Sequence, residues 1–147
     1  MRVRDIMTVH VAFCLPEKPV KEAAEMMVTC DCGAIPVVDP VTRKAVGIVT
    51  DRDIVCRAVA KGLDPARVRV EEIMTMPIVA VRPDDSLENC VSVMESAQVR
   101  RMPVVDAQGF LCGVVSQADI ARAAPAPETG HLVHDISRAT DHASQVQ

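Results

Sequence analysis

Tryptophan and tyrosine are absent from this 147-residue chain, and only two residues are phenylalanine. Ring-on-ring stacking therefore cannot be the main way in which the protein holds a flat ligand. No run of 18 or more apolar residues is present, so no membrane-spanning helix is expected. Basic residues are not in excess: 16 Lys and Arg stand against 20 Asp and Glu, with a net charge of −4. A nucleic-acid backbone is therefore not expected as the main partner.

The 49% of hydrophobic residues is enough for the core of a globular protein. The apolar start from Ile6 to Leu15 is interrupted by His10, and we interpret it as part of the fold rather than as a targeting segment. We therefore expect a cytoplasmic protein.

The chain has six cysteines, which raises the question of a metal or redox site. Cys30 and Cys32 form a Cys-x-Cys pair, but no second pair and no histidine near them completes a zinc-binding set. The other four stand in apolar patterns, where a free thiol behaves as a small hydrophobic residue: Cys14, Cys56, Cys90 and Cys112. We expect structural thiols and no metal site. A thiol redox protein that uses Cys30 and Cys32 is the alternative.

The first half of the chain recurs in the second half. Pro36-Val37-Val38-Asp39 returns 67 residues later (103 − 36) as Pro103-Val104-Val105-Asp106, and the Ile-Met-Thr of residues 6–8 returns at 73–75. Gly47-Ile48-Val49-Thr50 returns 66 residues later as Gly113-Val114-Val115-Ser116. We therefore divide the chain into residues 1–66, residues 67–124 and a polar tail at 125–147. We expect the tail to be mobile, and the two halves to fold against each other because one half is too small for much of a core.

Each copy predicts the same order of elements. The first copy predicts strands over 11–14, 35–38 and 45–50, and helices over 20–29 and 51–60. The second copy predicts a helix over 86–97, strands over 102–105 and 110–116, and a last helix from Gln117 that ends before Pro125. Glycines are expected to end the first-copy helices, at Gly33 and Gly62. The apolar stripes of the two longest helices consist of Val20, Ala23, Ala24, Met27 and Val28, and of Leu87, Cys90, Val91 and Met94.

One motif occurs in both copies and suggests chemistry. The motif consists of Gly, two apolar residues, Thr or Ser, any two residues and finally Asp. It spans Gly47 to Asp53 in the first copy and Gly113 to Asp119 in the second. A hydroxyl at the end of a strand and the first turn of a helix favour an anion such as phosphate. An ionised carboxylate only accepts hydrogen bonds, so it can bind both hydroxyls of a ribose. The alternative is that these residues only cap a helix.

These motifs resemble tandem cystathionine β-synthase (CBS) domains. The resemblance rests on the Ile-Met-Thr heads, Ile35-Pro-Val-Val-Asp39 and Met102-Pro-Val-Val-Asp106, and the two Gly-to-Asp motifs, and it covers about residues 1–124. It implies an α/β (α+β) fold of two pseudo-symmetric β-α-β-β-α units packed sheet to sheet. It also implies a stand-alone regulatory module without catalytic residues, which binds an adenosine compound in the clefts between the units. AMP, ADP or ATP is expected as a regulatory ligand, and no cofactor is required.

The resemblance also implies which residues contact the ligand. Asp53 and Asp119 would bind ribose, while Thr50 and Ser116 would face the phosphate or the ribose edge. Adenine would lie against four segments, two from each repeat. Those of the first repeat contain Thr8 and Val11, and Ala34, Ile35 and Pro36; those of the second contain Thr75 and Ile78, and Arg101, Met102 and Pro103.

The two copies differ in their arginines, and this difference suggests what selects the ligand. Gly33-Ala34 in the first copy becomes Arg100-Arg101 in the second, and Arg52 becomes Ala118. Because a guanidinium group suits phosphate, we expect Arg100, Arg101 and Arg52 to favour a phosphorylated ligand. A basic stretch that only stabilises the end of helix 86–97 is the alternative.

Partners are less constrained by the sequence. The resemblance implies a homodimer, and a conformational change on ligand binding would be read by an effector protein that the sequence does not identify. No histidine stands in a Ser-His or Cys-His relation, so no enzyme activity is expected. The remaining alternative is a structural dimerisation or adaptor protein whose clefts stay empty.

Overall fold

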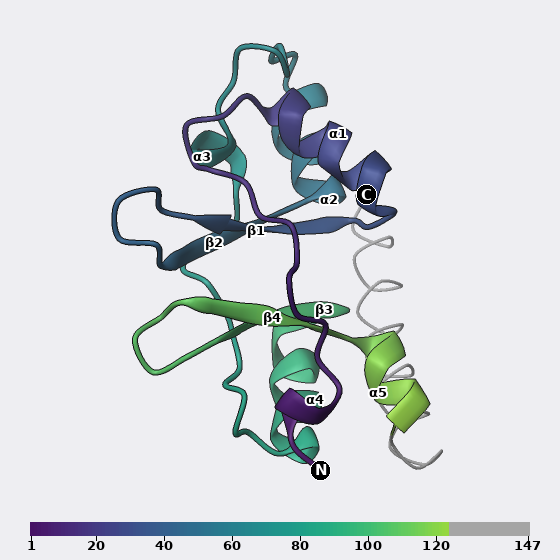
Figure 1. Cartoon of the computed structure of the whole chain (residues 1–147). Helices are drawn as coiled ribbons and strands as arrows, with labels where there is room; N and C mark the ends of the chain where they lie inside the picture. Colours follow the sequence, from purple (N-terminus) through teal and green to yellow (C-terminus); the bar gives the residue numbers. More distant parts are fainter. Residues whose placement is uncertain (124–147) are drawn as a thin grey trace. The chain divides into compact units, whose positions relative to one another are not determined.

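The computed structural model describes residues 1–123, so the tail predicted at 125–147 lies outside the described residues (Figure 1). The chain forms two compact units, which we name after their buried aspartates. The Asp53 unit contains Val11–Val79 and Gln108–Leu111, and the Asp119 unit contains Met1–His10, Ala80–Ala107 and residues 112–123. The units therefore do not follow the sequence repeats. The N-terminal segment of each repeat, which we call its head (residues 1–10 and 67–79), packs with the sheet of the other repeat.

The Asp53 unit combines helices with a two-stranded sheet, as a mixed α/β fold requires. Its helices are α1 (Val20–Cys30), α2 (Asp51–Asp53), the π-helix η2 (Ile54–Val59) and α3 (Val70–Ile73). Its strands are β1 (Ala34–Val38) and β2 (Ala45–Thr50), which pair antiparallel. The single helix predicted over 51–60 is therefore a short α-helix that continues as a π-helix, and Gly62, at φ 71°, follows its end.

Helix α1 confirms the predicted stripe in part. Val20, Ala23 and Met27 are buried, but Val28 is 83% exposed, so the stripe is narrower than predicted. The helix also ends before Gly33. Asp31 adopts the left-handed conformation at φ 51°, which a short polar side chain tolerates. Gly33 instead lies close to another side chain, because a Cβ atom placed there would be 2.7 Å from Oδ2 of Asp51.

The strand predicted over 11–14 is reduced to one bridge. Cys14 pairs with Val37 in parallel: the Cys14 amide donates to Pro36 at 3.0 Å, and the Val38 amide donates to Cys14 at 3.0 Å. Val81 makes the same bridge with Val104 in the Asp119 unit. A single bridged residue aligns the segment with the sheet, but it is too short to be a β-strand.

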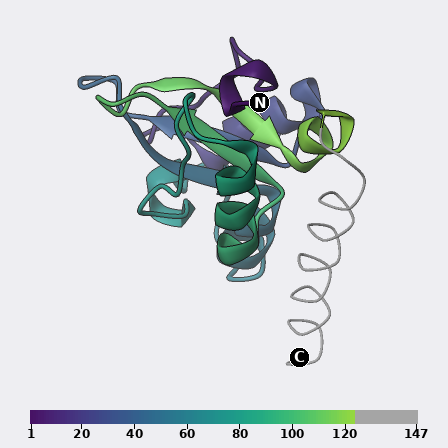
Figure 2. The ribbon, with the colours of Figure 1, turned by 90° about the horizontal axis from the view of Figure 1, so that it is seen from below.

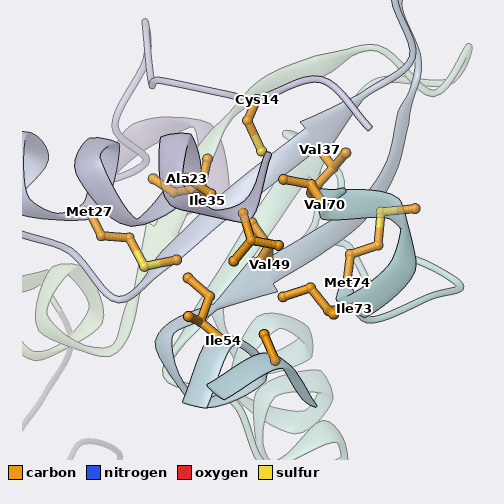
Figure 3. Close-up of a cluster of buried hydrophobic side chains, with 12 residues drawn as sticks. Cys14, Ala23, Met27, Ile35, Val37, Val49, Ile54, Val70, Ile73 and Met74 are labelled. Carbon is orange, nitrogen blue, oxygen red and sulfur yellow. The ribbon is translucent and has the colours of Figure 1, made fainter. Parts of the chain in front are cut away.

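The core of the Asp53 unit lies against β1 and β2. Figure 3 shows its side chains together, with α1, η2 and α3 around them. The strands supply Ile35, Val37 and Val49, and α3 supplies Val70 and Ile73, and all five are at most 2% exposed. Burial of one such aliphatic side chain stabilises the fold by about 1.5–3 kcal/mol.

The Asp119 unit repeats this plan. It contains the 3-10 helix η1 (Val3–Asp5), α4 (Leu87–Ala97), the paired strands β3 (Arg101–Val105) and β4 (Leu111–Ser116), and α5 (Gln117–Ala123). Leu87, Cys90 and Met94 of α4 are buried as predicted, and Val91 is partly buried. The Ser86 hydroxyl accepts the Asn89 amide at 3.1 Å and caps the helix. None of the helices within residues 1–123 has the length and apolar character that a membrane crossing needs.

The exchanged heads extend each sheet by one bridge. Thr8 pairs antiparallel with Val114, and the purple N-terminal segment lies beside the green strand β4 in both ribbon views (Figures 1 and 2). Thr75 pairs antiparallel with Ile48 in the Asp53 unit. Glycine makes both approaches possible: a Cβ atom at Gly113 would be 2.5 Å from the Thr8 carbonyl oxygen, and one at Gly47 would be 2.8 Å from that of Thr75. The repeated glycine therefore serves close backbone packing.

Candidate functional site

The Asp53 carboxylate lies where β2 ends and α2 begins. Thr50 is the N-cap: its hydroxyl oxygen accepts the Asp53 amide at 3.0 Å, and Oδ2 of Asp53 accepts the Thr50 amide at 3.0 Å. This reciprocal pair is a capping box. Asp53 is only 7% exposed, although it is acidic. The capping interpretation of the motif is therefore confirmed, and the carboxylate is also fixed in position.

Two further groups reach the same carboxylate. The Thr75 hydroxyl lies 3.1 Å from Oδ2 and 3.2 Å from Oδ1 of Asp53. Arg57, one turn along the helix, places Nε 3.8 Å from Oδ1. A terminal nitrogen of the same guanidinium group lies 3.3 Å from the carbonyl oxygens of Ile73 and Met74. Asp53 thus links the start of α2 to the head of the second repeat.

The Asp119 site has the same cap but different partners. Oδ2 of Asp119 accepts the Ser116 amide at 2.8 Å and the Ser116 hydroxyl at 2.8 Å, while the Asp119 amide donates to the Ser116 hydroxyl oxygen at 3.1 Å. Arg122 places a terminal nitrogen 2.5 Å from Oδ1. Asp119 is 9% exposed. Each unit therefore contains one buried carboxylate with a hydroxyl beside it at a strand end.

The register of the sheets brings some of the predicted residues to these carboxylates. Ala34 is the partner of Thr50 across the β1–β2 pair, and the Gly33 carbonyl accepts the Asp51 amide at 2.9 Å. The Arg100 carbonyl accepts the Gln117 amide at 2.8 Å in the equivalent place. Arg100 and Arg101 are exposed at the start of β3, and Arg52 is exposed on α2. The second repeat therefore has two exposed guanidinium groups at the place where the first repeat has Gly33 and Ala34.

Other predicted residues lie in the cores or in connecting segments. Ile35, Pro36, Met102 and Pro103 are buried. Val11 and Ile78 are half-buried and lie outside helices and strands. Thr8 is exposed, and it belongs to the Asp119 unit, whereas Val11 belongs to the Asp53 unit. The two residues therefore stand on either side of a unit boundary.

Arg57 and Arg122 were not among the predicted site residues. They stand four and three residues after their aspartates, a spacing at which side chains on a helix meet. That spacing was visible in the sequence. It was missed because the two arginines do not align between the repeats: the residue 66 positions after Arg57 is Ala123.

The cysteines are free thiols. Burial raises the pKa of the Cys14 thiol to about 12 and that of Cys90 to about 11. Burial also raises the pKa of Cys112, which is half-buried. Cys56 also stands in an apolar sequence pattern, but its side chain is exposed on η2, so it is not a core residue as Cys14 and Cys90 are. Within residues 1–123, no group of three or more His, Cys, Asp and Glu side chains gathers as a metal site would require.

Comparison with known proteins gives the family context. The family model for the CBS domain matches residues 3–59 and 70–126. Hypoxic response protein 1 of Mycobacterium tuberculosis is 38% identical over 122 residues, which cover 83% of this chain and 84% of that protein.

The solved structures that are similar to this chain include the following three. That of Hypoxic Response Protein I with two coordinated zinc ions has a TM-score of 0.78 and 38% identity, covering 85% of this chain and 100% of that one. CBSX2 in complex with AMP, a protein of Arabidopsis thaliana, has a TM-score of 0.72 and 29% identity, covering 83% and 94%. The CBS domain pair of MJ0100 in complex with 5′-methylthioadenosine and S-adenosyl-L-methionine has a TM-score of 0.72 and 28% identity, with the same coverage.

Proposed function

This chain belongs to the CBS-domain family, and we propose that it is a regulatory module that binds an adenosine-containing ligand, with AMP, ADP or ATP preferred. The observation that carries the proposal is the pair of buried carboxylates, one in each unit, each fixed beside a strand-end hydroxyl. Support also comes from two similar structures, since CBSX2 holds AMP and MJ0100 holds 5′-methylthioadenosine and S-adenosyl-L-methionine.

The carboxylates would bind the ribose. Capping does not exhaust their capacity, because an ionised carboxylate has about four acceptor positions and the cap uses only one or two of them. Hydrogen bonds to a charged group each contribute about 1.5–3 kcal/mol. The base would be held by aliphatic groups and backbone edges, since the chain has no tryptophan or tyrosine. Micromolar affinity follows once the entropy of association is subtracted.

Phosphate selection would fall to the exposed arginines. Arg100 and Arg101 stand at the start of β3, next to the Gln117 amide that opens α5. A guanidinium group binds phosphate with a fixed pair of donors, so these residues would favour nucleotides over adenosine. In this proposal the chain has no catalytic activity of its own. The ligand shifts the equilibrium between two conformations of the chain, and an effector protein binds one of them preferentially.

A thermal-shift panel of adenosine, AMP, ADP, ATP and S-adenosylmethionine tests this proposal. A ligand at 100 times its Kd stabilises the fold by about 2.7 kcal/mol, which gives a clear rise in Tm. We expect AMP, ADP or ATP to raise Tm more than adenosine does, and the variant Arg100→Gln/Arg101→Gln to remove that difference. Guanosine monophosphate is the control for the base. If no adenine compound shifts Tm, the structural adaptor alternative is favoured instead.

A further inference from the structure

Thr8 and Thr75 occupy equivalent places in the two repeats, 67 residues apart (75 − 8). Their backbones make the same contacts. The Thr75 amide donates to Ile48 at 2.8 Å and the Ile48 amide to Thr75 at 3.2 Å, while the Thr8 amide donates to Val114 at 2.9 Å and the Val114 amide to Thr8 at 3.0 Å. Any difference between the two threonines therefore lies in their side chains.

Their side chains do differ. The Thr75 hydroxyl lies within 3.2 Å of both carboxylate oxygens of Asp53. Across residues 1–123, no hydrogen bond runs from the Thr8 hydroxyl to Asp119, which has Ser116 and Arg122 as its side-chain partners instead. Thr75 is an exposed residue, whereas Asp53 is buried.

We propose that Thr75 is an internal competitor of the ligand: its hydroxyl occupies the position on Asp53 that a sugar hydroxyl would take. This inference rests on the proposed function. One hydroxyl close to both carboxylate oxygens resembles one half of a ribose diol, and the two cannot occupy the same position. A ligand that binds at Asp53 must therefore displace Thr75, whereas within residues 1–123 no threonine hydroxyl is hydrogen-bonded to Asp119.

Displacement of Thr75 has a structural consequence. Residues 73–75 are held to the rest of the Asp53 unit by the burial of Ile73 and Met74 in its core and by three kinds of polar contact. The polar contacts are the Thr75 side chain, the backbone bridge to Ile48, and the Arg57 guanidinium group on the carbonyls of Ile73 and Met74. Loss of the hydrogen bonds of the Thr75 side chain weakens the attachment of this part of the second repeat to the sheet of the first. Binding of a ligand at Asp53 is thereby coupled to how firmly residues 73–75 are attached to the sheet.

The test measures AMP affinity by calorimetry with one site removed at a time. Thr75→Val and Thr75→Ser are made in an Asp119→Asn background, and Thr8→Val, the matched control, in an Asp53→Asn background. Thr75→Val keeps the side-chain shape but lacks the hydroxyl, so we expect AMP to bind about fivefold more tightly than to the background. Thr75→Ser retains the hydroxyl and should not tighten AMP binding, and Thr8→Val, which removes no hydrogen bond to Asp119, should not tighten it either.

Two outcomes would count against the inference. If AMP binds the Asp119→Asn background and Thr75→Val binds it equally or more weakly, Thr75 is not a competitor, although the proposed function stands. If AMP binds neither background nor the unaltered chain, the proposed function fails and the competitor role fails with it. The Tm of the ligand-free variants shows independently whether the contact exists, because Thr75→Val should lower Tm and Thr8→Val should not.

Discussion

Cys14 and Cys90 are thiols enclosed in the two cores, and their environment sets their chemistry. Burial is the main cause that raises their pKa values, from 9.0 to about 12 and about 11, and Glu22 and Asp85 add to the effect through their negative charges. Only the thiolate attacks an alkylating reagent. At neutral pH we therefore expect iodoacetamide to modify the exposed Cys30 and Cys56 and to leave these two unmodified, as read by mass spectrometry of the folded protein.

The same thiols predict how stability depends on pH. Below pH 9 they are protonated in both the folded and the unfolded chain and contribute no pH dependence. Above pH 9 the unfolded chain releases these protons while the folded chain retains them, so the free energy of unfolding falls until pH passes about 11 to 12. Cys14→Val with Cys90→Ala introduces the residues of the other repeat, Val81 and Ala23, and should reduce this alkaline loss. An unchanged loss would contradict the assignment.

At Asp53 and Asp119 the residue pattern predicted the cap correctly, because a cap depends on residues three apart in sequence. It could not predict that Thr75 would also bind Asp53, since that contact joins residues 22 apart. Nor did it show that Val28 is exposed, because helical periodicity indicates an apolar stripe but not how far the neighbouring elements cover it.

At the scale of elements, local patterns predicted strand β2 with its observed bounds and the start of α1 at Val20. The π-helix η2 was not predicted, because its hydrogen bonds, such as that from the Ala60 amide to the Val55 carbonyl at 2.8 Å, leave no mark in the apolar pattern. The strand predicted at 11–14 is one bridge for a similar reason: strand propensity does not specify how many residues find a partner.

The repeated glycines make a prediction about how each head is attached to its sheet. Gly113→Ala places a Cβ atom 2.5 Å from the Thr8 carbonyl oxygen, and Gly47→Ala places one 2.8 Å from that of Thr75. Backbone must move in both, so we expect losses of about 1–3 kcal/mol in denaturant unfolding, larger for Gly113. Gly62→Ala is the comparison, because nothing lies within 4 Å there and only its φ of 71° is unfavourable. Equal losses at Gly62, Gly47 and Gly113 would speak against close packing as the cause.

At the scale of the whole molecule, the duplication predicted two related units but not the exchange of their heads. An offset of 67 shows that residues 6–8 and 73–75 are equivalent, yet it does not show with which sheet each one pairs. That choice depends on contacts between distant residues, such as the approach of Thr8 to Gly113.

A homodimer is expected from the sequence resemblance, and we propose that exposed apolar side chains on η2 form its interface. Val55 and Val59 stand four residues apart, and each is 57% exposed. We expect Val55→Glu/Val59→Glu to shift the mass measured by light scattering from that of a dimer to that of a monomer. Val41→Glu is the control, because Val41 is 88% exposed in the turn between β1 and β2. A monomer in the unaltered chain, or a dimer that survives the η2 variant, would contradict the proposal.

We propose that one carboxylate in each unit binds a ribose, and a calorimetric titration with AMP is the decisive experiment. We expect Asp53→Asn and Asp119→Asn each to remove one binding site, the double variant to bind no AMP, and Asp39→Asn, in the β1–β2 turn, to bind AMP as the unaltered chain does. Undiminished binding of AMP by the folded double variant would contradict it.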